Sequence, residues 1–437
     1  MLKDEFYRSG DATVTHLKAL IAGQDDKRFV AKAALYARKE AGMRSVTHLA
    51  AAELARQVKG QSWTAGFYDR VVHRPDDAIE ILACYRGTHG DVIPNSLKKG
   101  LGRALARFDE YQLAKYRKDR ADLSLVDVVN LVHPPATEAL GKLMKGTLAP
   151  AETWETKLTQ AGSAAQNEDD LTTLKREAWS ELVHSRKIGY FALLRNLRNI
   201  LEAAPDAVNA ALALLRDEKL IRRSLVLPFR FQTALDAVQA SQLPRASDAL
   251  AALSDAVDIS LANVPVFPGR TLVALDGSGS MAGRPLQVGS LFAATLLKAN
   301  HADVILFSHA AKYVTLNKRD STLSLAKRLQ GQAQAAGTDF HSIFQCADRA
   351  YDRVIILSDM QGWMGHHAPV ETFRRWKQRH RCDPKVFSFD LNGYGSLQFP
   401  ERQVCCLAGF SDKTLETLKL LDADPGALIR MIEAVEL

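Results

Sequence analysis

The sequence lacks any long apolar segment. No run of about 18 apolar side chains occurs in its 437 residues, so no membrane-spanning helix is expected. The first residues, MLKDEFYRSGD, contain no apolar core, and we therefore expect no signal peptide. With an apolar content of 47% and a charged content of 24%, the chain has the composition of a globular protein, and we predict a cytoplasmic location without membrane contact.

Cysteine is scarce, and its arrangement argues against a disulfide framework. The chain has five cysteines, an odd number, and no C-x-x-C pair. This usage is typical of reduced thiols in a cytosolic protein. The adjacent Cys405 and Cys406 are interpreted as part of a strand core in preference to a redox pair.

Familiar catalytic motifs are also missing. The sequence contains no H-E-x-x-H, no G-x-x-x-x-G-K-[ST] and no G-x-S-x-G. The G-S-G-S run at residues 277–280 has no assignable His and Asp partners for a nucleophilic serine. These absences predict a protein that is not an enzyme.

Charge is nearly balanced overall but concentrated locally. The formal net charge is +7, whereas the stretch from Arg86 to Arg120 holds nine Lys or Arg against four Asp or Glu. A basic stretch of this kind permits nucleic-acid binding without proving it, because most charge runs are solvated helix faces.

Two regions differ in the periodicity of their apolar residues. Residues 1–262 show helical spacing almost throughout, and the number and spacing of the helices favour a helical-repeat solenoid over a large globular bundle. Residues 263–437 alternate between apolar strands and amphipathic helices, which predicts a doubly wound α/β domain with a mostly parallel sheet. The segment ANVPVFPGR, at residues 262–270, marks the boundary.

Oxygen-bearing side chains gather where predicted strands of the second region end. Asp276, Ser278 and Ser280 follow the apolar run TLVAL, Asp359 follows VIILS, and Thr338 lies in the loop segment GTDF. Clusters of Gly, Ser and Asp are often only turns. Carboxylates and hydroxyls at the carboxyl edge of such a sheet, however, suit a hard divalent cation, and they predict a Mg²⁺ site with a position open to an acidic partner group.

This metal set resembles the metal-ion-dependent adhesion site (MIDAS) of von Willebrand factor A (vWA) domains. A helical block followed by such a domain resembles the TROVE module proteins, the family of the Ro autoantigen and its bacterial orthologues. The likeness also rests on four further segments, which are FALLRNLRN at 191–199, EKLIRRSLVLPF at 218–229, KYRKDR at 115–120 followed by NLVH, and Gly409-Phe410.

The resemblance implies both an architecture and a function. It implies a ring or solenoid of HEAT-like repeats in residues 1–262, joined by a vWA domain in residues 263–437. It implies a monomeric ribonucleoprotein subunit in RNA quality control, which binds Y-like small structured RNA and the single-stranded 3′ ends of misfolded non-coding RNA. An exoribonuclease tethered through the RNA is a further implied partner. KYRKDR departs from the family pattern by one additional residue before its His.

The candidate RNA-binding residues are basic side chains of the helical block. On a helix, positions 99 and 103 share a face, and Tyr116 adds an aromatic ring to the second basic segment. The alternatives are solvated helix faces for the charge runs and a simple helix end for the histidine. The full set is Lys98, Lys99, Arg103, Lys115, Arg117, Lys118, Arg120, His133, Arg186, Lys187 and Arg195.

Two other functions remain open on the sequence alone. One is a metal-dependent protein-interaction scaffold that does not bind RNA. The other, a metal-dependent nuclease, is disfavoured because both carboxylates belong to the adhesion-type set. A second basic run at residues 374–385 could add RNA affinity or form a solvated outer helix, and Trp363, His366 and His367 are weaker candidates beside the metal loop.

Overall fold

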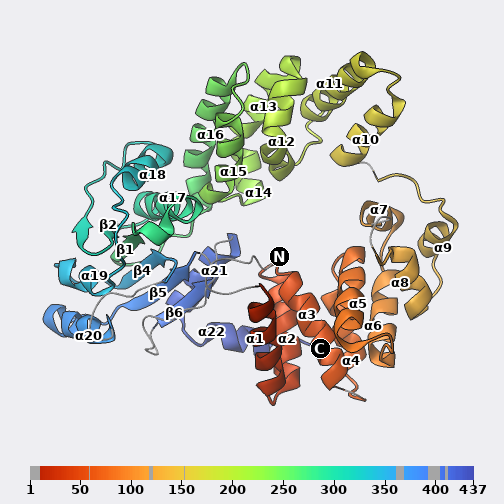
Figure 1. Ribbon diagram of the computed structural model, residues 1–437, viewed down its shortest axis with the longest axis horizontal. Coiled ribbons are helices and arrows are strands. Elements are labelled where there is room, and N and C mark those ends of the chain that lie inside the picture. Colours follow the sequence, from red (N-terminus) through yellow and green to blue (C-terminus); the bar gives the residue numbers. More distant parts are fainter. Residues whose placement is uncertain are drawn as a thin grey trace. The chain divides into compact units, whose positions relative to one another are not determined.

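The computed structural model describes residues 10–58, 60–117, 122–151, 153–360, 369–391, 404–408 and 412–437 (Figure 1). The chain forms two compact units. The first unit comprises residues 1–159 and 424–437, and the second comprises residues 160–423. Trp363, His366, His367, Lys118, Arg120 and the Gly409-Phe410 pair lie outside the described residues.

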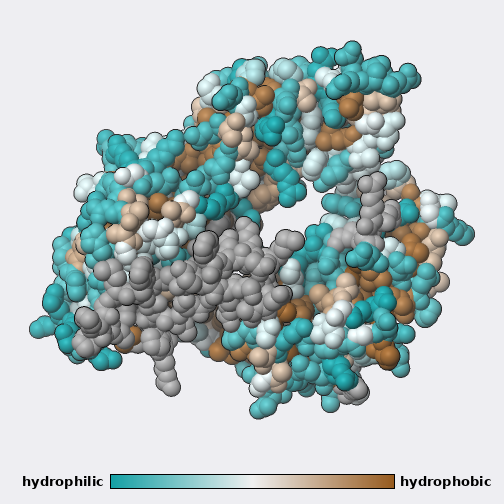
Figure 2. All heavy atoms as spheres, in the orientation of Figure 1, coloured by the Kyte–Doolittle hydropathy of each residue, from teal (hydrophilic) through white to brown (hydrophobic). Residues whose placement is uncertain are grey.

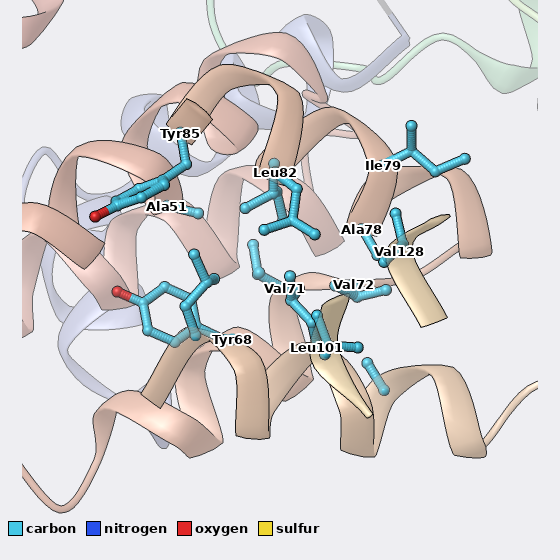
Figure 3. Close-up of a cluster of buried hydrophobic side chains, with 14 of the residues drawn as sticks. Ala51, Tyr68, Val71, Val72, Ala78, Ile79, Leu82, Tyr85, Leu101 and Val128 are labelled. Atoms are coloured by element: carbon cyan, nitrogen blue, oxygen red, sulfur yellow. The ribbon is translucent and has the colours of Figure 1, made fainter. Parts of the chain in front are cut away.

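The first unit is helical. Its helices pack around one continuous core of buried aliphatic and aromatic side chains, part of which is drawn in Figure 3. The bounds are α1 (Gly10–Gly23), α2 (Lys27–Lys39), α3 (Ser45–Gln57), α4 (Thr64–Val71), α5 (Pro75–His89), α6 (Asn95–Ala106), α7 (Glu110–Lys115), α8 (Leu125–Val132), α9 (Glu138–Lys145) and α22 (Ala427–Glu433). Helix α10 (Trp154–Ala164) spans the boundary between the units.

Helix α6 shows how the apolar stripe produces the packing. Leu97, Leu101 and Leu105 recur at helical spacing and are completely buried. Gly100 lets α6 approach α4 closely, because a Cβ there would lie 2.4 Å from Cβ of Tyr68. The N-cap residue of α6 is Pro94, and no side chain caps the helix.

The second unit begins with further helices. They are α11 (Glu168–His184), α12 (Tyr190–Ala203), α13 (Val208–Leu215), α14 (Glu218–Ser224), α15 (Gln232–Gln239) and α16 (Ala246–Ser260), with short 3₁₀ turns η1 (Pro205–Ala207), η2 (Pro228–Phe231) and η3 (Leu261–Asn263). On the face shown in Figure 2, hydrophilic residues dominate the outer surface of the helices, and hydrophobic residues show mainly in small groups between them. That distribution is the outcome of burying one stripe of each helix.

A six-stranded sheet follows in the same unit. Its strand order is β3-β2-β1-β4-β5-β6, and every neighbouring pair is parallel except β2 with β3. The strands are β1 (Thr271–Asp276), β2 (Ala302–Phe307), β3 (Ala311–Tyr313), β4 (Arg353–Ser358), β5 (Lys385–Asp390) and β6 (Val404–Ala408). The intervening elements are η4 (Gly279–Met281), α17 (Arg284–Ala299), α18 (Thr322–Gly331), α19 (His341–Cys346), α20 (Pro369–His380) and α21 (Asp412–Ala423).

The predicted fold class is confirmed: a helical block precedes a doubly wound α/β domain of the vWA type. The compact units, however, cut the chain elsewhere than at residue 262. Arg284 at the start of α17 pairs with Asp236 of α15 at 2.9 Å, and Lys298 pairs with Asp258 of α16 at 2.8 Å. The last third of the helical block thus packs on the α/β domain, whereas α22 packs against α2 in the first unit.

Candidate metal centre and nucleic-acid interface

The carboxyl edge of the sheet brings the predicted metal ligands together. Strand β1 lies between β2 and β4 and is parallel to both, so the loops after β1 and β4 leave the sheet side by side. Asp276 ends β1 and Asp359 follows β4, and both are completely buried. Ser278 and Thr338 are also buried, whereas Ser280 is exposed. The site is therefore closed on the protein side and opens to solvent at Ser280.

Hydrogen bonds hold the Asp276 carboxylate in a defined orientation. Oδ1 accepts from the backbone N–H of Ser278 at 2.8 Å, and Oδ2 accepts from the hydroxyl of Ser358 at 2.6 Å. The hydroxyl oxygens of Ser278 and Ser280 lie 3.2 Å apart. Ser358 escaped the sequence interpretation, although its place as the last residue of β4, directly before Asp359, is the signal that points to it.

Backbone contacts fix the loop that carries Thr338 over the loop after β1. The N–H of Gly279 donates to the carbonyl of Ala336 at 3.0 Å, and the N–H of Gly277 donates to Phe307 at 2.8 Å. A Cβ on Gly277 would lie 3.2 Å from Cα of Ala333, so only glycine permits this approach without displacement. Thr338 is thereby held beside the Asp276 loop.

The electrostatics of this edge favour a bound cation. Burial, reinforced by the charge of Asp359, raises the pKa of Asp276 to about 6, against the lowering effect of hydrogen bonds from Ser358 and Ser278. The hydroxyl oxygen of Thr338 is buried and makes no hydrogen bond to a described residue. Two buried carboxylates and three hydroxyls form a hard oxygen donor set, which fits Mg²⁺. No cluster of three His, Cys, Asp or Glu side chains with metal-site geometry occurs among the described residues.

Most of the predicted RNA-binding residues lie in the first unit. Lys98 is half-buried on α6, and Lys99 and Arg103 are exposed there. Helix α6 meets the end of α8, since a Cβ on Gly102 would lie 3.3 Å from Cα of Pro134. His133, which is exposed and ends α8 in a left-handed conformation, therefore lies near the turn of α6 that carries Arg103.

Cations and aromatic rings cluster at the end of α7. Lys115 Nζ lies 5.6 Å from the ring centroid of Tyr111 and 5.5 Å from that of Tyr116. On Tyr116 the guanidinium of Arg74 also stacks, at 4.1 Å. Tyr111 is 46% exposed, so part of this side chain remains accessible beside the positive charge of Lys115. Arg117 follows and is half-buried.

Three of the candidates belong to the other compact unit. Arg186 and Lys187 are exposed in the turn before α12, and Arg186 pairs with Asp217 at 3.4 Å. Arg195 is exposed on α12. The neighbouring Asn196 is buried and donates to the carbonyl of Ala192 at 3.0 Å, so its side chain serves its own helix.

The second basic run lies on α20 and its exit. Several of its cations are engaged within the domain: Arg375 pairs with Glu371 at 2.7 Å, and Lys377 pairs with Asp383 at 3.2 Å. Phe373 and Trp376 of the same helix are buried in the core. The run thus forms the outer face of an amphipathic helix.

The fold and the site together define a class: a helical-repeat block joined to a vWA-type domain whose sheet edge carries a hard-cation donor set. A family model described as TROVE domain matches residues 3–140 and 121–266. The chain belongs to the TROVE family, which is an RNA-binding, ribonucleoprotein family. The recognition of this family from the sequence is confirmed.

Individual relatives are distant. Telomerase protein component 1 from Mus musculus is 25% identical over 305 residues, covering 49% of this chain and 11% of that protein. The Rattus norvegicus protein of the same name gives the same identity and coverage. The chain thus matches about a tenth of these curated relatives' length. The crystal structure of the Deinococcus radiodurans Ro (RSR) protein matches 95% of this chain and 93% of its own, with a TM-score of 0.69 and 17% identity, a likeness that shows the fold.

No helix in the described part of the chain is long and apolar enough to cross a membrane.

Proposed function

We propose that this protein is a non-enzymatic RNA-binding subunit that holds Y-like small structured RNA and the single-stranded 3′ ends of misfolded RNA, in cytoplasmic RNA quality control. An exoribonuclease reached through the bound RNA is the proposed decay partner. Membership of an RNA-binding family supports the first step of the proposal. The Ro-like fold, in which a helical block precedes a vWA-type domain, supports the proposal at the level of architecture.

The cation–aromatic cluster at the end of α7 is the observation that carries the proposal. Lys115 Nζ lies 5.6 Å from the ring centroid of Tyr111 and 5.5 Å from that of Tyr116, and Tyr111 is nearly half exposed. A positive charge attracts the phosphate backbone, and an open aromatic face stacks an unpaired base. Solvated basic helix faces do not need this pairing, whereas single-stranded RNA recognition uses both parts.

For the metal centre we propose Mg²⁺ held by Asp276, Ser278, Ser280, Thr338 and Asp359. Two carboxylates only balance the charge of the ion, so the exposed side at Ser280 leaves a coordination position for an acidic group of a partner. The role proposed for the ion is adhesive and structural.

The first experiment measures binding to a structured RNA with and without a single-stranded 3′ tail, across a salt series and with Mg²⁺ present or absent. We expect preference for the tailed RNA, a steep loss of affinity with salt and no cleavage. A double variant, Arg103→Glu with Lys115→Glu, should lower the affinity and reduce the slope of log K against log salt by roughly 1–2.

A matched control carries the same charge change in the other unit: Lys175→Glu with Arg176→Glu on the exposed face of α11. Equal losses in the two double variants would reduce the RNA surface to a general charge effect. Absence of RNA binding at low salt would overturn the proposal and leave the metal-dependent protein scaffold, for which Asp276→Ala should abolish partner capture. Cleavage of RNA that depends on Mg²⁺ and is lost in Asp276→Ala would instead indicate a nuclease.

A further inference from the structure

A cavity of about 710 Å³ lies in the first unit, among α3, α4, α5 and α6. It is large enough for one nucleotide and too small for an RNA duplex, since pockets for small ligands measure about 300–1,000 Å³. Of the residues that line it, only Lys99 belongs to the RNA-binding set predicted from the sequence. Its described lining is Ala55, Arg56, Gly60, Gln61, Thr64, Ala65, Tyr85, His89, Val92, Pro94, Asn95, Ser96 and Lys99.

The lining carries positive charge and no carboxylate. Arg56 and Lys99 are both exposed, and neither forms an ion pair with a described residue. His89 contacts Glu53 at 3.2 Å, but Glu53 also pairs with Lys18 at 3.5 Å, so its charge is already matched. A negatively charged ligand is therefore attracted to this cavity without an acidic side chain of the lining to oppose it.

The start of α6 adds backbone donors to these cations. Asn95 and Ser96 begin the helix and line the cavity, and Pro94 supplies no side-chain cap. The first N–H groups of α6 thus lack the usual capping partner, and the positive end of the helix dipole points at the same place. Phosphate is the group that such an end binds best.

The rest of the lining is apolar and partly aromatic. Ala55, Tyr85, Val92 and Pro94 offer surface to a flat, weakly polar group. Close packing of α4 on α6 at Gly100 fixes the relative position of these two helices, which both contribute lining residues to the cavity. A phosphate joined to a planar ring system combines the two requirements, and the unmodified side chains of a peptide do not.

We propose that this cavity binds one unstacked nucleotide, with its phosphate toward Arg56, Lys99 and the start of α6. The proposal rests on the proposed function for its source, which is single-stranded RNA already held by the basic surface of the same unit. It gives that surface a discrete anchor for one residue of the strand.

The test uses the full chain, a single-stranded decamer carrying one 4-thiouridine, and free adenosine and uridine 5′-monophosphate. Ser96→Glu places a carboxylate at the phosphate end while favouring the helix, because acidic residues stabilise a first turn. We expect it to weaken decamer binding about 10-fold, which corresponds to about 1.4 kcal/mol, and to abolish crosslinks to the peptide of Tyr85 and His89. Arg56→Glu should do the same.

Two controls separate this effect from misfolding and from general charge. Ser96→Ala should retain binding, and Arg28→Glu, an exposed arginine of α2 outside the cavity, should change it much less than Arg56→Glu does. Decamer binding that is unchanged in Ser96→Glu, with crosslinks elsewhere, would overturn the cavity proposal while leaving the proposed function intact. Monophosphate binding that Ser96→Glu weakens, without decamer binding, would overturn RNA as the source. If the protein bound neither the decamer nor the monophosphates, both the cavity proposal and the proposed function would be overturned.

Discussion

Two buried aspartates, one in each compact unit, have opposite surroundings. Asp77 in α5 is completely buried and receives cations from two other helices. Arg38 donates to it at 2.7 Å and Arg44 at 2.9 Å, and His48 Nε2 lies at 3.0 Å. Asp276 is equally buried, but its partners are hydroxyl and backbone groups and its charged neighbour is another carboxylate.

The contrast appears in their proton affinities. Burial alone would raise the pKa of Asp77, yet hydrogen bonds from His48 and Arg38 and the charge of Arg38 outweigh burial and lower it. For Asp276, burial dominates and its pKa rises. The charge of Asp77 is neutralised by cations of the same chain, so Asp77 has a structural role. Asp276 is surrounded by oxygen atoms and another carboxylate, so it is suited to bind an external cation.

The largest expected effect on stability comes from replacing each of the two aspartates, Asp77 and Asp276, by asparagine in turn. Asp77→Asn leaves Arg38 buried without a counter-charge, so we expect the first unit to lose about 3–5 kcal/mol of stability. Asp276→Asn, in Mg²⁺-free buffer, should lose little or even gain, because it removes one of two like charges. Hydrogen exchange of the α5 and β1 amides reports the two units separately. Similar losses of stability in the two variants would contradict the difference proposed between Asp77 and Asp276.

Acid should act on the Asp77 network next. A folded-state pKa below the unfolded value of about 3.9 means that this carboxylate stabilises the fold above about pH 4 and that its contribution falls away below. The protection of α5 amides should therefore decline between about pH 4 and pH 2. Asp77→Asn should start lower and show a flatter decline. A wild-type profile that is flat over this range would contradict the role assigned to the network.

Magnesium should sharpen the other half of the comparison. At a concentration 100 times its dissociation constant, Mg²⁺ should stabilise the second unit by about 2.7 kcal/mol, whatever that constant is. Thermal unfolding with and without MgCl₂ measures this, and Asp276→Asn should not respond. Asp77→Asn is the matched control and should keep the full response. A response of the wild type that persists in Asp276→Asn would place the ion elsewhere.

The sequence predicted these two sites very unequally. The metal set is readable because Asp276, Ser278 and Ser280 are adjacent along the chain and Asp359 ends a strand whose parallel pairing follows from the α/β pattern. The Asp77 network is not readable, because Arg38 and Arg44 reach it from more than 30 residues away through helix packing that periodicity does not specify. The cavity beside α6 could not be predicted from the sequence for the same reason, because it also depends on how the helices pack.

Element types were predicted well and their ends less well. Strand–helix alternation after residue 270 predicts the sheet domain, but it does not predict where a single element ends, such as the end of α19 at Cys346. The packing of α22 on α2 and of α16 on α18 depends on contacts between distant segments, which explains why the compact units do not follow the predicted boundary at residue 262. The local sequence pattern predicts the helices and strands, whereas contacts between distant segments decide which of them form one compact unit.

The smallest expected effect concerns the residue that orients Asp276. The hydroxyl of Ser358 donates to Asp276 Oδ2 and accepts from the N–H of Met360 at 2.9 Å, in a fully buried position. Ser358→Ala removes no ligand, so Mg²⁺ should still bind, but about 10–100-fold more weakly, as is usual when a group that orients a ligand is lost. Titration calorimetry with MgCl₂ measures this directly. The matched control is Ser260→Ala, which deletes another buried hydroxyl of the same unit. Each serine variant should lose about 1 kcal/mol of stability, but Ser260→Ala should leave the Mg²⁺ affinity unchanged. If the two serine variants bound Mg²⁺ alike, the orientation of Asp276 would not depend on Ser358, and the difference between the two buried aspartates would rest on charge alone.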